Sequence, residues 1–495
     1  MIINNELQKW LSKFKKLNGR NLKILHVGNI AGNAFLNAKF MRRIGIDADV
    51  MCNDYYHIMG YPEWEEIRID QSYGQDIMPC FSCEDVLNYE RPSWFAQGPL
   101  DLCISYLNAR NTGNLEQEKI DKKKINDFLF GKPVESNLEI KLPTNVFKKS
   151  IRIGKFLTKF MWRYINATYL TNKINSKYKN SFPNRQFRFK TSDFFGYSHY
   201  KSKFQTLFSH YDIVQFYGTD PIFGLMFCKK PFVGFEHGTL RTFTSDDSFI
   251  NALTALAYRN ANHVFITNAD CLEYAKNLEM NRYSAMIHPV DVEQHRFRDQ
   301  LAIQHLRSHF SADVLLFCPM RHDWEIKGTD KHIRALPLIN KIVGRNIVLV
   351  MTNWGADLQK SKDLAKSMGV EQQIIWLPPM CRLKMIELIQ ASDVILEQTI
   401  LPCFGSTAPQ ALACGVPTIM SYKPEVTTWI FDSPAPLIQA KNEVEIAEGV
   451  KQALDKKWLI DFKIEAKMWI DRYHSSSLAL DKQIGVYKNI LSEQK

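Results

Sequence analysis

Three side chains that can bind anions follow two of the apolar runs in this sequence. His237 comes after the run 231–235, and Arg321 and Lys327 come after the run 314–318. An arginine offers a bidentate fork and a lysine a compact charge, so this pair could neutralise a diphosphate leaving group. A histidine beside a glycine at a strand end can donate to a phosphate or a hydroxyl, although a lone histidine is more often structural. Exposed charges without a ligand are the alternative for Arg321 and Lys327.

A glycine-containing loop follows the apolar run 23–28. Gly28, Gly32 and Asn33 would let backbone amides approach a ligand at the start of the next helix, which favours an anion. The spacing G-x-x-x-G differs from the dinucleotide fingerprint G-x-G-x-x-G, so an NAD site is poorly supported. A tight turn without a ligand is the alternative.

Another glycine loop follows the run 394–397 and leads into a helix. We expect this helix to begin near Gly405, with Pro409 in its first turns. Free amides at the start of a helix, with the positive end of the helix dipole behind them, suit a phosphate or a sugar. The amides in question belong to Gly405, Ser406 and Thr407.

The elements that would position these loops are two sets of short β-rich runs separated by helical patterns. The first set comprises residues 23–28, 48–51, 212–216, 231–235 and 263–267, and the second comprises residues 314–318, 346–351, 373–377, 394–397 and 417–421. Alternating strands and helices are typical of parallel sheets, in which ligands bind beyond the carboxyl ends of the strands. The sequence therefore predicts an α/β chain of two Rossmann-like lobes with a hinge between residues 288 and 300.

The positive charge of the chain is concentrated in residues 141–205, which carry +14 while the remainder carries −3. Within residues 145–170, aliphatic and aromatic side chains recur at helical spacing with lysines and arginines between them. Such a helix suits an anionic membrane surface, to which each cation contributes on the order of 1 kcal/mol. A helical insertion that packs on its parent lobe is the second reading. A groove for single-stranded nucleic acid is the third and the least favoured.

Composition excludes several classes of protein. The 495 residues are 45% hydrophobic and 23% charged, which is ordinary for a globular chain and too apolar for a disordered one. We find no apolar run of about 18 residues and no leader with an apolar core, so we expect no membrane-spanning helix and no signal peptide. Cys80 and Cys83 form a C-x-x-C motif without a second pair, so no zinc site is expected. A reduced, cytoplasmic compartment is the simplest expectation.

In this order and at these separations, the loops resemble those of GT-B glycosyltransferases of the family-4 type, also described as glycosyl transferases group 1. The pattern R-x5-K-G at Arg321, Lys327 and Gly328 and the pattern G-x4-Q-A-x-A-C-G-x-P at residues 405–417 look like that family's donor-diphosphate and donor-sugar motifs. Residues 287–297 (IHPVDVEQHRF) look like its segment between the lobes. The resemblance covers both lobes and is firmest in the second.

The chain departs from the family pattern at one motif. The family carries two glutamates separated by seven residues, where this sequence has Pro402 and Gln410. In the family the second glutamate accepts hydrogen bonds from the ribose, which a glutamine carbonyl can still do. The first contacts the donor sugar, which the Pro402 side chain cannot do. Glu397 resembles an acidic residue that some members carry at this offset, so it is the candidate to compensate.

The resemblance implies a hexosyltransferase that moves a sugar from a UDP- or GDP-type donor to a glycan or lipid-linked acceptor, with retention and without a metal or a bound cofactor. It also implies a place in bacterial surface polysaccharide synthesis, peripheral at the inner face of the membrane. His237, Arg321 and Lys327 would act in catalysis. Donor binding would involve Gly28, Gly32, Asn33, Glu397, Gly405, Ser406, Thr407 and Gln410.

The same resemblance assigns the parts of the chain. Residues 1–100 and 206–292 would form the acceptor lobe, residues 101–205 a basic, largely helical insertion, residues 293–470 the nucleotide-sugar lobe, and residues 471–495 a helix crossing back to the first lobe. Two other functions share the architecture. A catalytically lapsed module that binds lipid or glycan is suggested by Pro402 and Gln410, and a nucleotide-sugar epimerase would need a cleft carboxylate such as Glu236.

Overall fold

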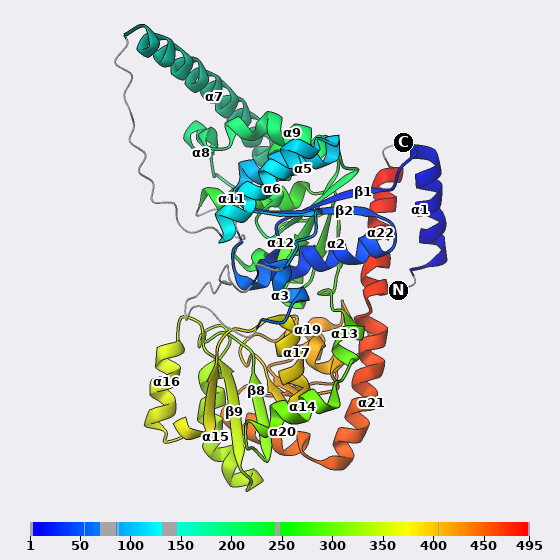
Figure 1. The fold of residues 1–495 in the computed structure, drawn as a ribbon, viewed down its shortest axis with the longest axis vertical. Coiled ribbons are helices and arrows are strands. Elements are labelled where there is room, and N and C mark those ends of the chain that lie inside the picture. Colours follow the sequence, from blue (N-terminus) through cyan, green and yellow to red (C-terminus); the bar gives the residue numbers. More distant parts are fainter. Residues whose placement is uncertain are drawn as a thin grey trace.

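The structure is a computed structural model of residues 1–495 that describes residues 3–493 except 54, 70–85, 87–88, 131–145, 243–247 and 404. The side chains of residues 146–156 are also outside the description. The chain forms two lobes, each built on a parallel sheet with helices on its faces (Figure 1). The α/β class and the two Rossmann-like lobes predicted from the sequence are confirmed.

The first lobe contains a seven-stranded sheet in the order β3-β2-β1-β4-β5-β6-β7. Every strand pairs in parallel with its neighbours. Its central strands β4 and β5 are buried throughout, as expected for strands covered on both faces. The bounds are β1 Lys23–Val27, β2 Asp47–Cys52, β3 Phe95–Gln97, β4 Ile213–Tyr217, β5 Phe232–Glu236, β6 His263–Ile266 and β7 Tyr283–Ala285.

Helices cover both faces of this sheet. Their bounds are α1 Asn5–Asn18, α2 Asn33–Arg43, α3 Pro62–Glu66, α5 Leu100–Thr112, α6 Leu115–Phe130, α7 Val146–Ser181, α8 Thr191–Phe195, α9 Lys201–Ser209, α10 Pro221–Phe227, α11 Phe249–Asn260 and α12 Leu272–Asn277. Helix α5 contacts β2 and β3, and its Tyr106 and Leu107 are buried in the core. The first part of residues 101–205 is therefore built into the lobe.

The second lobe contains a six-stranded parallel sheet in the order β10-β9-β8-β11-β12-β13. The strands are β8 Val314–Cys318, β9 Ile347–Thr352, β10 Ile374–Leu377, β11 Val394–Leu396, β12 Thr418–Met420 and β13 Ile438–Gln439. The helices from residue 292 onward are α13 Val292–Arg296, α14 Gln300–Ser308, α15 Thr329–Val343, α16 Leu358–Ser367, α17 Arg382–Ala391, α18 Thr407–Ala413, α19 Pro424–Thr427, α20 Glu443–Ala453, α21 Lys456–Tyr473 and α22 Ser476–Ser492. No helix in the described part of the chain is both long enough and apolar enough to cross a bilayer.

The last two helices run along one side of the molecule from the second lobe to the first (Figure 1). Helix α22 contacts α1 and α2. Its buried Gln483 donates from Nε2 to Asn37 Oδ1 at 3.0 Å, and Tyr487 donates to Gln215 Oε1 at 2.6 Å. The end of the chain is thus part of the first lobe's core.

The lobes also meet directly at a seam between α3 and α17. Arg382 is 4% exposed, donates to Glu65 Oε1 at 3.0 Å and lies 3.9 Å from the centre of the Trp64 ring. Nearby, Arg68 pairs with Glu387 at 2.5 Å where both side chains are partly exposed. Because buried polar groups need partners, this seam holds the lobes in one relative position.

Candidate active site between the lobes

The carboxyl ends of strands from both sheets meet at the boundary between the lobes. His237 directly follows β5 in the first lobe, Arg321 and Lys327 follow β8, and Glu397 follows β11. Open parallel sheets bind ligands at this end of their strands. The structure therefore brings candidate residues from both lobes to one region.

The imidazole of His237 lies among aromatic rings. It stacks on Tyr217 with ring centres 5.6 Å apart and on His288 at 5.9 Å. Burial lowers the pKa of His237 well below its usual value, and His288 adds to this shift. Its Nε2 has no hydrogen-bond partner among the described residues. A neutral imidazole with a free nitrogen can accept or donate one hydrogen bond to a ligand, depending on its tautomer.

The loop of Gly28, Gly32 and Asn33 lies beside this histidine pair. Gly28 has φ +89°, and a side chain there would lie 2.6 Å from Asp220. Gly32 has φ +73° and faces Glu65 in the same way. Asn33 is the first residue of α2, and its Oδ1 lies 3.4 Å from His288 Nδ1. The turn geometry therefore explains the two glycines. Asn33 contacts His288, and the ring of His288 stacks on that of His237.

Arg321 and Lys327 occupy one tight loop between β8 and α15. Lys327 N and Gly328 N both donate to Asp323 O, at 2.9 and 3.1 Å, and Gly328 has φ +68°. Arg321 is partly exposed and donates to Asp323 Oδ2 at 2.9 Å. Lys327 Nζ donates to Gln398 Oε1 at 2.5 Å. The loop thus presents one accessible guanidinium and one ammonium that is held in place.

The ammonium of Lys327 lies in a partly buried environment of mixed charge. Burial lowers the pKa of Lys327, and the neighbouring carboxylate of Glu397 opposes that shift. Glu397 is 3% exposed, and its Oε2 accepts from Gln398 N at 2.9 Å. Burial raises the pKa of Glu397, while Lys327 opposes it. Glu397 therefore lies close enough to Lys327 for their charges to interact, and its predicted contact with the donor stays a prediction.

Gln410 lies inside the second lobe at the start of α18, the helix predicted to begin near Gly405. It is 2% exposed, and its Oε1 has no hydrogen-bond partner among the described residues. Ser406 is the N-cap of this helix without a side-chain cap, and Gly405 and Thr407 are half-buried beside it. A buried acceptor without a partner costs about 1–3 kcal/mol, so this carbonyl suits a ligand hydroxyl.

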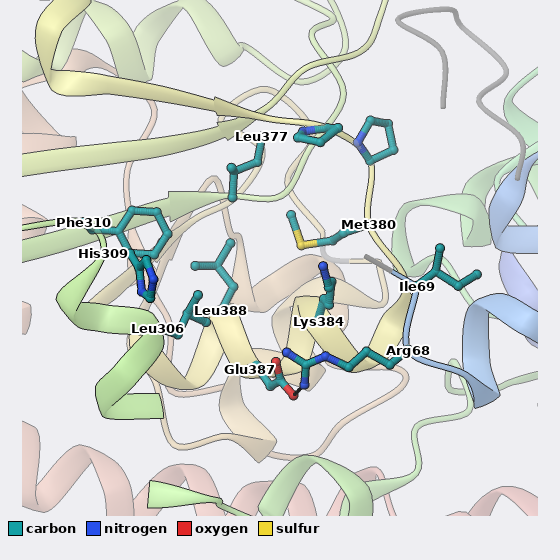
Figure 2. Close-up of a pocket in the computed structure, with 12 residues that line it drawn as sticks. Arg68, Ile69, Leu306, His309, Phe310, Leu377, Met380, Lys384, Glu387 and Leu388 are labelled. Atoms are coloured by element: carbon teal, nitrogen blue, oxygen red, sulfur yellow. Dashed lines mark hydrogen bonds and ion pairs between the residues drawn. The ribbon is translucent and has the colours of Figure 1, made fainter. Parts of the chain in front are cut away.

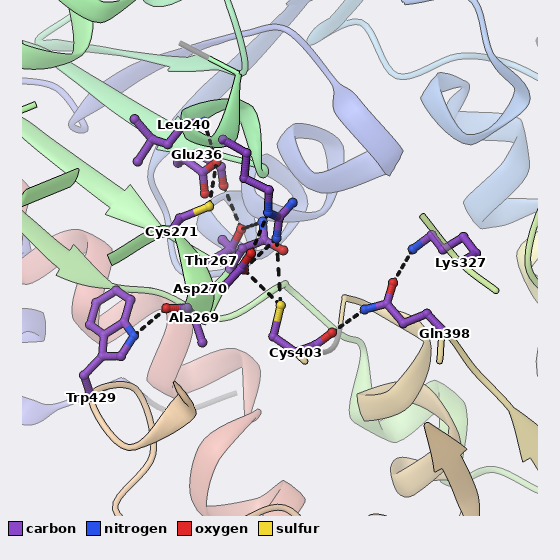
Figure 3. A network of polar contacts seen from close by, with 12 residues as sticks. Glu236, Leu240, Thr267, Ala269, Asp270, Cys271, Lys327, Gln398, Cys403 and Trp429 are labelled. Atoms are coloured by element: carbon purple, nitrogen blue, oxygen red, sulfur yellow. Dashed lines mark hydrogen bonds and ion pairs between the residues drawn. The ribbon is translucent and has the colours of Figure 1, made fainter. Parts of the chain in front are cut away.

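A cluster that the sequence analysis did not find connects the lobes at this point (Figure 3). It comprises Arg241 and Asp270 of the first lobe and Cys403 of the second, whose thiol donates to Asp270 Oδ1 at 3.0 Å. Trp429 adds a second link by donating to Ala269 O at 2.8 Å. Arg241 lies four residues after His237, but no spacing rule pairs it with Asp270 or Cys403. Only the tertiary fold brings them together.

Glu236, the carboxylate required by the epimerase reading, is fully buried at the end of β5. Its Oε1 accepts from Leu240 N at 3.3 Å and lies 3.6 Å from the thiol of Cys271 (Figure 3). Burial raises its pKa to about 6, and the Leu240 amide opposes this shift. Both contacts of Glu236 Oε1 are with residues of the first lobe.

One apolar pocket lies apart from this region. This pocket of about 380 Å³ is lined by α14, α17 and the end of β10, with Arg68 at one side, and contains none of the predicted site residues (Figure 2). Within the described residues, no group of three or more histidine, cysteine, aspartate or glutamate side chains is placed to hold a metal ion. Cys80 and Cys83 lie outside the described residues.

The comparison with family models decides what this second lobe is. Residues 309–471 match the family described as glycosyl transferases group 1. This part of the chain is therefore similar to a group 1 glycosyltransferase domain. This domain extends from the end of α14 through most of α21 and contains Arg321, Lys327, Glu397 and Gln410. The predicted resemblance to group 1 glycosyltransferases is confirmed for this lobe, and the family-4 type stays a prediction.

Curated relatives match over shorter stretches. D-inositol 3-phosphate glycosyltransferase of Acidothermus cellulolyticus is 24% identical over 138 residues, which is 28% of this chain and 31% of that relative. The protein of the same description from Mycobacteroides abscessus is 27% identical over 97 residues, or 19% of this chain and 21% of that relative. These matches span less than a third of the relatives' length.

Solved structures match over nearly the whole chain. Sucrose-phosphate synthase of Thermosynechococcus elongatus aligns with a TM-score of 0.56 at 11% identity and covers 96% of this chain and 100% of that one. A UDP-forming α,α-trehalose-phosphate synthase of Burkholderia xenovorans aligns with a TM-score of 0.52 at 12% identity and covers 94% and 99%. At these identities the likeness concerns the fold, and the predicted GT-B architecture is confirmed.

Proposed function

We propose that this protein transfers a sugar from a nucleotide-diphosphate donor, of the UDP or GDP type, to a glycan or lipid-linked acceptor. The observation that carries the proposal is the pair formed by a fixed ammonium and an unpartnered carbonyl inside the group 1 domain. Lys327 is held in the loop after β8, and Gln410 Oε1 lies buried in α18 without a hydrogen-bond partner among the described residues. The relatives' descriptions as glycosyltransferases and as a UDP-forming synthase support the same class of donor.

The chemistry we assign to these residues is stabilisation of a leaving diphosphate. Negative charge develops on that group as the bond to the sugar breaks, and a preorganised cation in a dry site lowers the barrier. Lys327 and Arg321 supply the charge, and the amides of residues 405–407 supply dipoles. Neutral His237, with its free nitrogen, orients a sugar hydroxyl from the first lobe. We extend to this chain the family's retention of anomeric configuration.

The region of positive charge supports a location at a membrane surface. Helix α7 packs through its second half, where Ala167, Leu170, Ile174 and Tyr178 are buried. Its first half extends away from the body of the lobe (Figure 1). Residues 157–169, from the first half into the middle of the helix, expose seven large apolar or aromatic side chains, namely Leu157, Phe160, Met161, Trp162, Tyr164, Ile165 and Tyr169.

Exposed aromatic side chains among cations suit an anionic lipid surface better than water. Lys159 and Arg163 are interleaved with these apolar residues, and the segment as a whole carries +14. We therefore propose peripheral attachment to the inner face of a membrane, with a lipid-linked or glycan acceptor of surface polysaccharide synthesis. Residues 141–145, which begin the segment, lie outside the described part of the chain.

A hydrolysis screen over UDP- and GDP-sugars tests the proposed reaction. Glycosyltransferases slowly release nucleotide from the cognate donor without an acceptor, so one donor should give nucleotide release above a boiled control. Arg321→Ala should lower that rate by roughly 10²-fold, the scale for one preorganised donor. Arg334→Ala, a partly exposed arginine on α15, is the control and should keep the rate. If no donor is consumed while UDP or GDP still binds, the protein is a lapsed module.

A further inference from the structure

A continuous chain of polar contacts leads from the first lobe to the ammonium of Lys327 (Figure 3). It begins at Asp270, passes through Cys403 and Gln398, and ends at Lys327 Nζ. Only the first of these contacts crosses between the lobes. The position of the ammonium is therefore connected to the contact between lobes.

Asp270 is held rigidly in the first lobe. Arg241 donates from Nε and Nη2 to its two carboxylate oxygens, each at 2.6 Å. Gly238, with φ +91°, leaves room for this guanidinium against the backbone beside His237. Burial would raise the pKa of Asp270, but the hydrogen bonds from Arg241 lower it below its usual value. Asp270 thus remains a charged acceptor.

Cys403, which belongs to the second lobe, contacts the carboxylate of Asp270. It is 2% exposed, and its thiol donates to Asp270 Oδ1 at 3.0 Å. Burial raises the pKa of the Cys403 thiol to about 12, and Asp270 adds to this shift. The thiol therefore keeps its proton at neutral pH, and the contact is a hydrogen bond from a neutral donor to a charged acceptor.

The backbone of Cys403 in turn orients Gln398. Gln398 Nε2 donates to Cys403 O, and Gln398 Oε1 accepts from Lys327 Nζ at 2.5 Å. An ammonium can only donate and a carbonyl can only accept, so both ends require the same orientation of the amide. A displaced Cys403 loop would free the amide to rotate and leave Lys327 without its partner.

We propose that Asp270 is a positioning residue for Lys327, acting through Cys403 and Gln398, so that contact between the lobes fixes the ammonium in place. The inference rests on the proposed function in treating Lys327 as the group that binds the leaving diphosphate. The contacts themselves do not depend on that assignment. Separating the lobes removes the Asp270 contact, loosens the Cys403 loop and releases the amide that holds Lys327.

The test is the rate at which an acylating reagent modifies Lys327 in the full-length protein at one fixed pH, quantified by peptide mass spectrometry. Lys331, which lies four residues after Lys327 in the first turn of α15, serves as the internal reference. Cys403→Ala and Asp270→Asn should raise the labelling of Lys327 relative to Lys331 by about two- to tenfold, the factor for one lost hydrogen bond. Cys403→Ser should label like the parent, because a hydroxyl still donates to Asp270.

Asp212→Asn is the matched control. Asp212 forms a bidentate pair with Arg20 at 2.7 Å just before β4, away from the lobe boundary. It should leave the labelling of Lys327 unchanged. Equal labelling in the parent, Cys403→Ala and Asp270→Asn would overturn the proposal. A Cys403→Ser protein that labels like Cys403→Ala would overturn it too, because the thiol would then act only by filling space.

Turnover separates this inference from the proposed function. With the cognate donor, Cys403→Ala should lower kcat by about two- to tenfold with KM nearly unchanged, and Cys403→Ser should restore it. Altered labelling with no donor consumed by any variant would support the positioning contact and contradict the proposed function. Unaltered labelling with normal turnover in Cys403→Ala would contradict the positioning contact and leave the proposed function intact.

Discussion

Gln410 shows most clearly how one residue can reveal a binding site. A glutamine buried to 2% exposure normally has partners for its polar atoms, yet Oε1 has none among the described residues. This carbonyl does not stabilise the fold, so we infer that it is there to bind a ligand. The family's glutamate at this position had already suggested a contact with ribose.

We expect Gln410→Leu to separate binding from stability. Leucine fills a similar volume without an unpaired acceptor, so the free energy of unfolding should be unchanged or higher. Nucleotide affinity should fall by about 1–2 kcal/mol, because the ribose hydroxyl loses its acceptor. Urea unfolding and calorimetric titration measure the two quantities. Gln410→Glu should keep the affinity, and an unchanged affinity in Gln410→Leu would place the ribose elsewhere.

Sequence reasoning found the cations of the site but not the residues that hold them. Arg321 and Lys327 follow a strand in a recognisable pattern, and a strand end is visible in a sequence. Gln398, Cys403 and Asp270 are brought together by tertiary contact across the lobes, for which one sequence carries no signal. The interaction of Glu397 with Lys327 was not predicted, and its contact with the donor stays a prediction.

At the scale of elements, the predicted strands agree with the structure to within one or two residues in both sheets. The short strands β3, β7 and β13 were not predicted. Each has two or three residues and lies at the edge of its sheet. Edge strands this short contain no repeating apolar pattern, so periodicity cannot reveal them. The central strands β1, β2, β4, β5, β8 and β9 are almost entirely buried runs of five or six residues and therefore stand out.

Helix α7 should bind anionic vesicles through its projecting half. We expect the parent to sediment with vesicles that contain anionic lipid, less so as salt rises, because the Debye length is already about 8 Å at 0.15 M. Leu157, Met161 and Ile165 are exposed at a spacing of four residues on one face. Changing all three to serine should release the protein from the vesicles, because the apolar contact with the interface is lost.

The matched control for this experiment lies on α21. Ile460, Ile464 and Met468 have the same spacing and similar exposure in the second lobe. Changing these three to serine should leave sedimentation unchanged. A parent that never binds anionic vesicles, or a loss of binding only in the α21 variant, would show that α7 is not the attachment site.

At the scale of the whole molecule, the seam between α3 and α17 should contribute strongly to stability. Arg382→Met leaves the buried carboxylate of Glu65 unpaired, which costs about 3–5 kcal/mol for a buried ion pair. Arg68→Met breaks the partly exposed pair with Glu387 on the same seam and should cost about 0–1 kcal/mol. Urea unfolding measures both. Equal losses of unfolding free energy in the two variants would mean that burial of the Arg382–Glu65 pair does not add to stability.

Buried histidines should make the fold sensitive to acid. Burial lowers the pKa of His26, His332 and His474 to about 3 and that of His288 and His295 to about 4. In the unfolded chain they titrate near 6.5, so the unfolded state binds more protons below that pH. The stability they contribute is complete above about pH 6.5 and is lost as pH falls toward 4.

Unfolding free energies at pH 7.5, 6.5 and 5.5 check this expectation. Each such histidine removes up to about 1.4 kcal/mol per pH unit in the window. His332→Asn should flatten the profile, whereas His305→Asn on an exposed part of α14 should not. A parent whose stability is constant from pH 7.5 to 5.5 would contradict the burial of these imidazoles.

Calorimetric titration with UDP and GDP shows whether the group 1 domain binds a nucleoside diphosphate at Lys327. We predict that at least one nucleotide binds with 1:1 stoichiometry and that Lys327→Met weakens it by about tenfold or more, since a charged hydrogen bond contributes about 1.5–3 kcal/mol. Lys331→Met, in the first turn of α15, should bind like the parent. Binding heat from neither nucleotide, or equal affinity in the parent and Lys327→Met, would contradict a nucleotide site at Lys327.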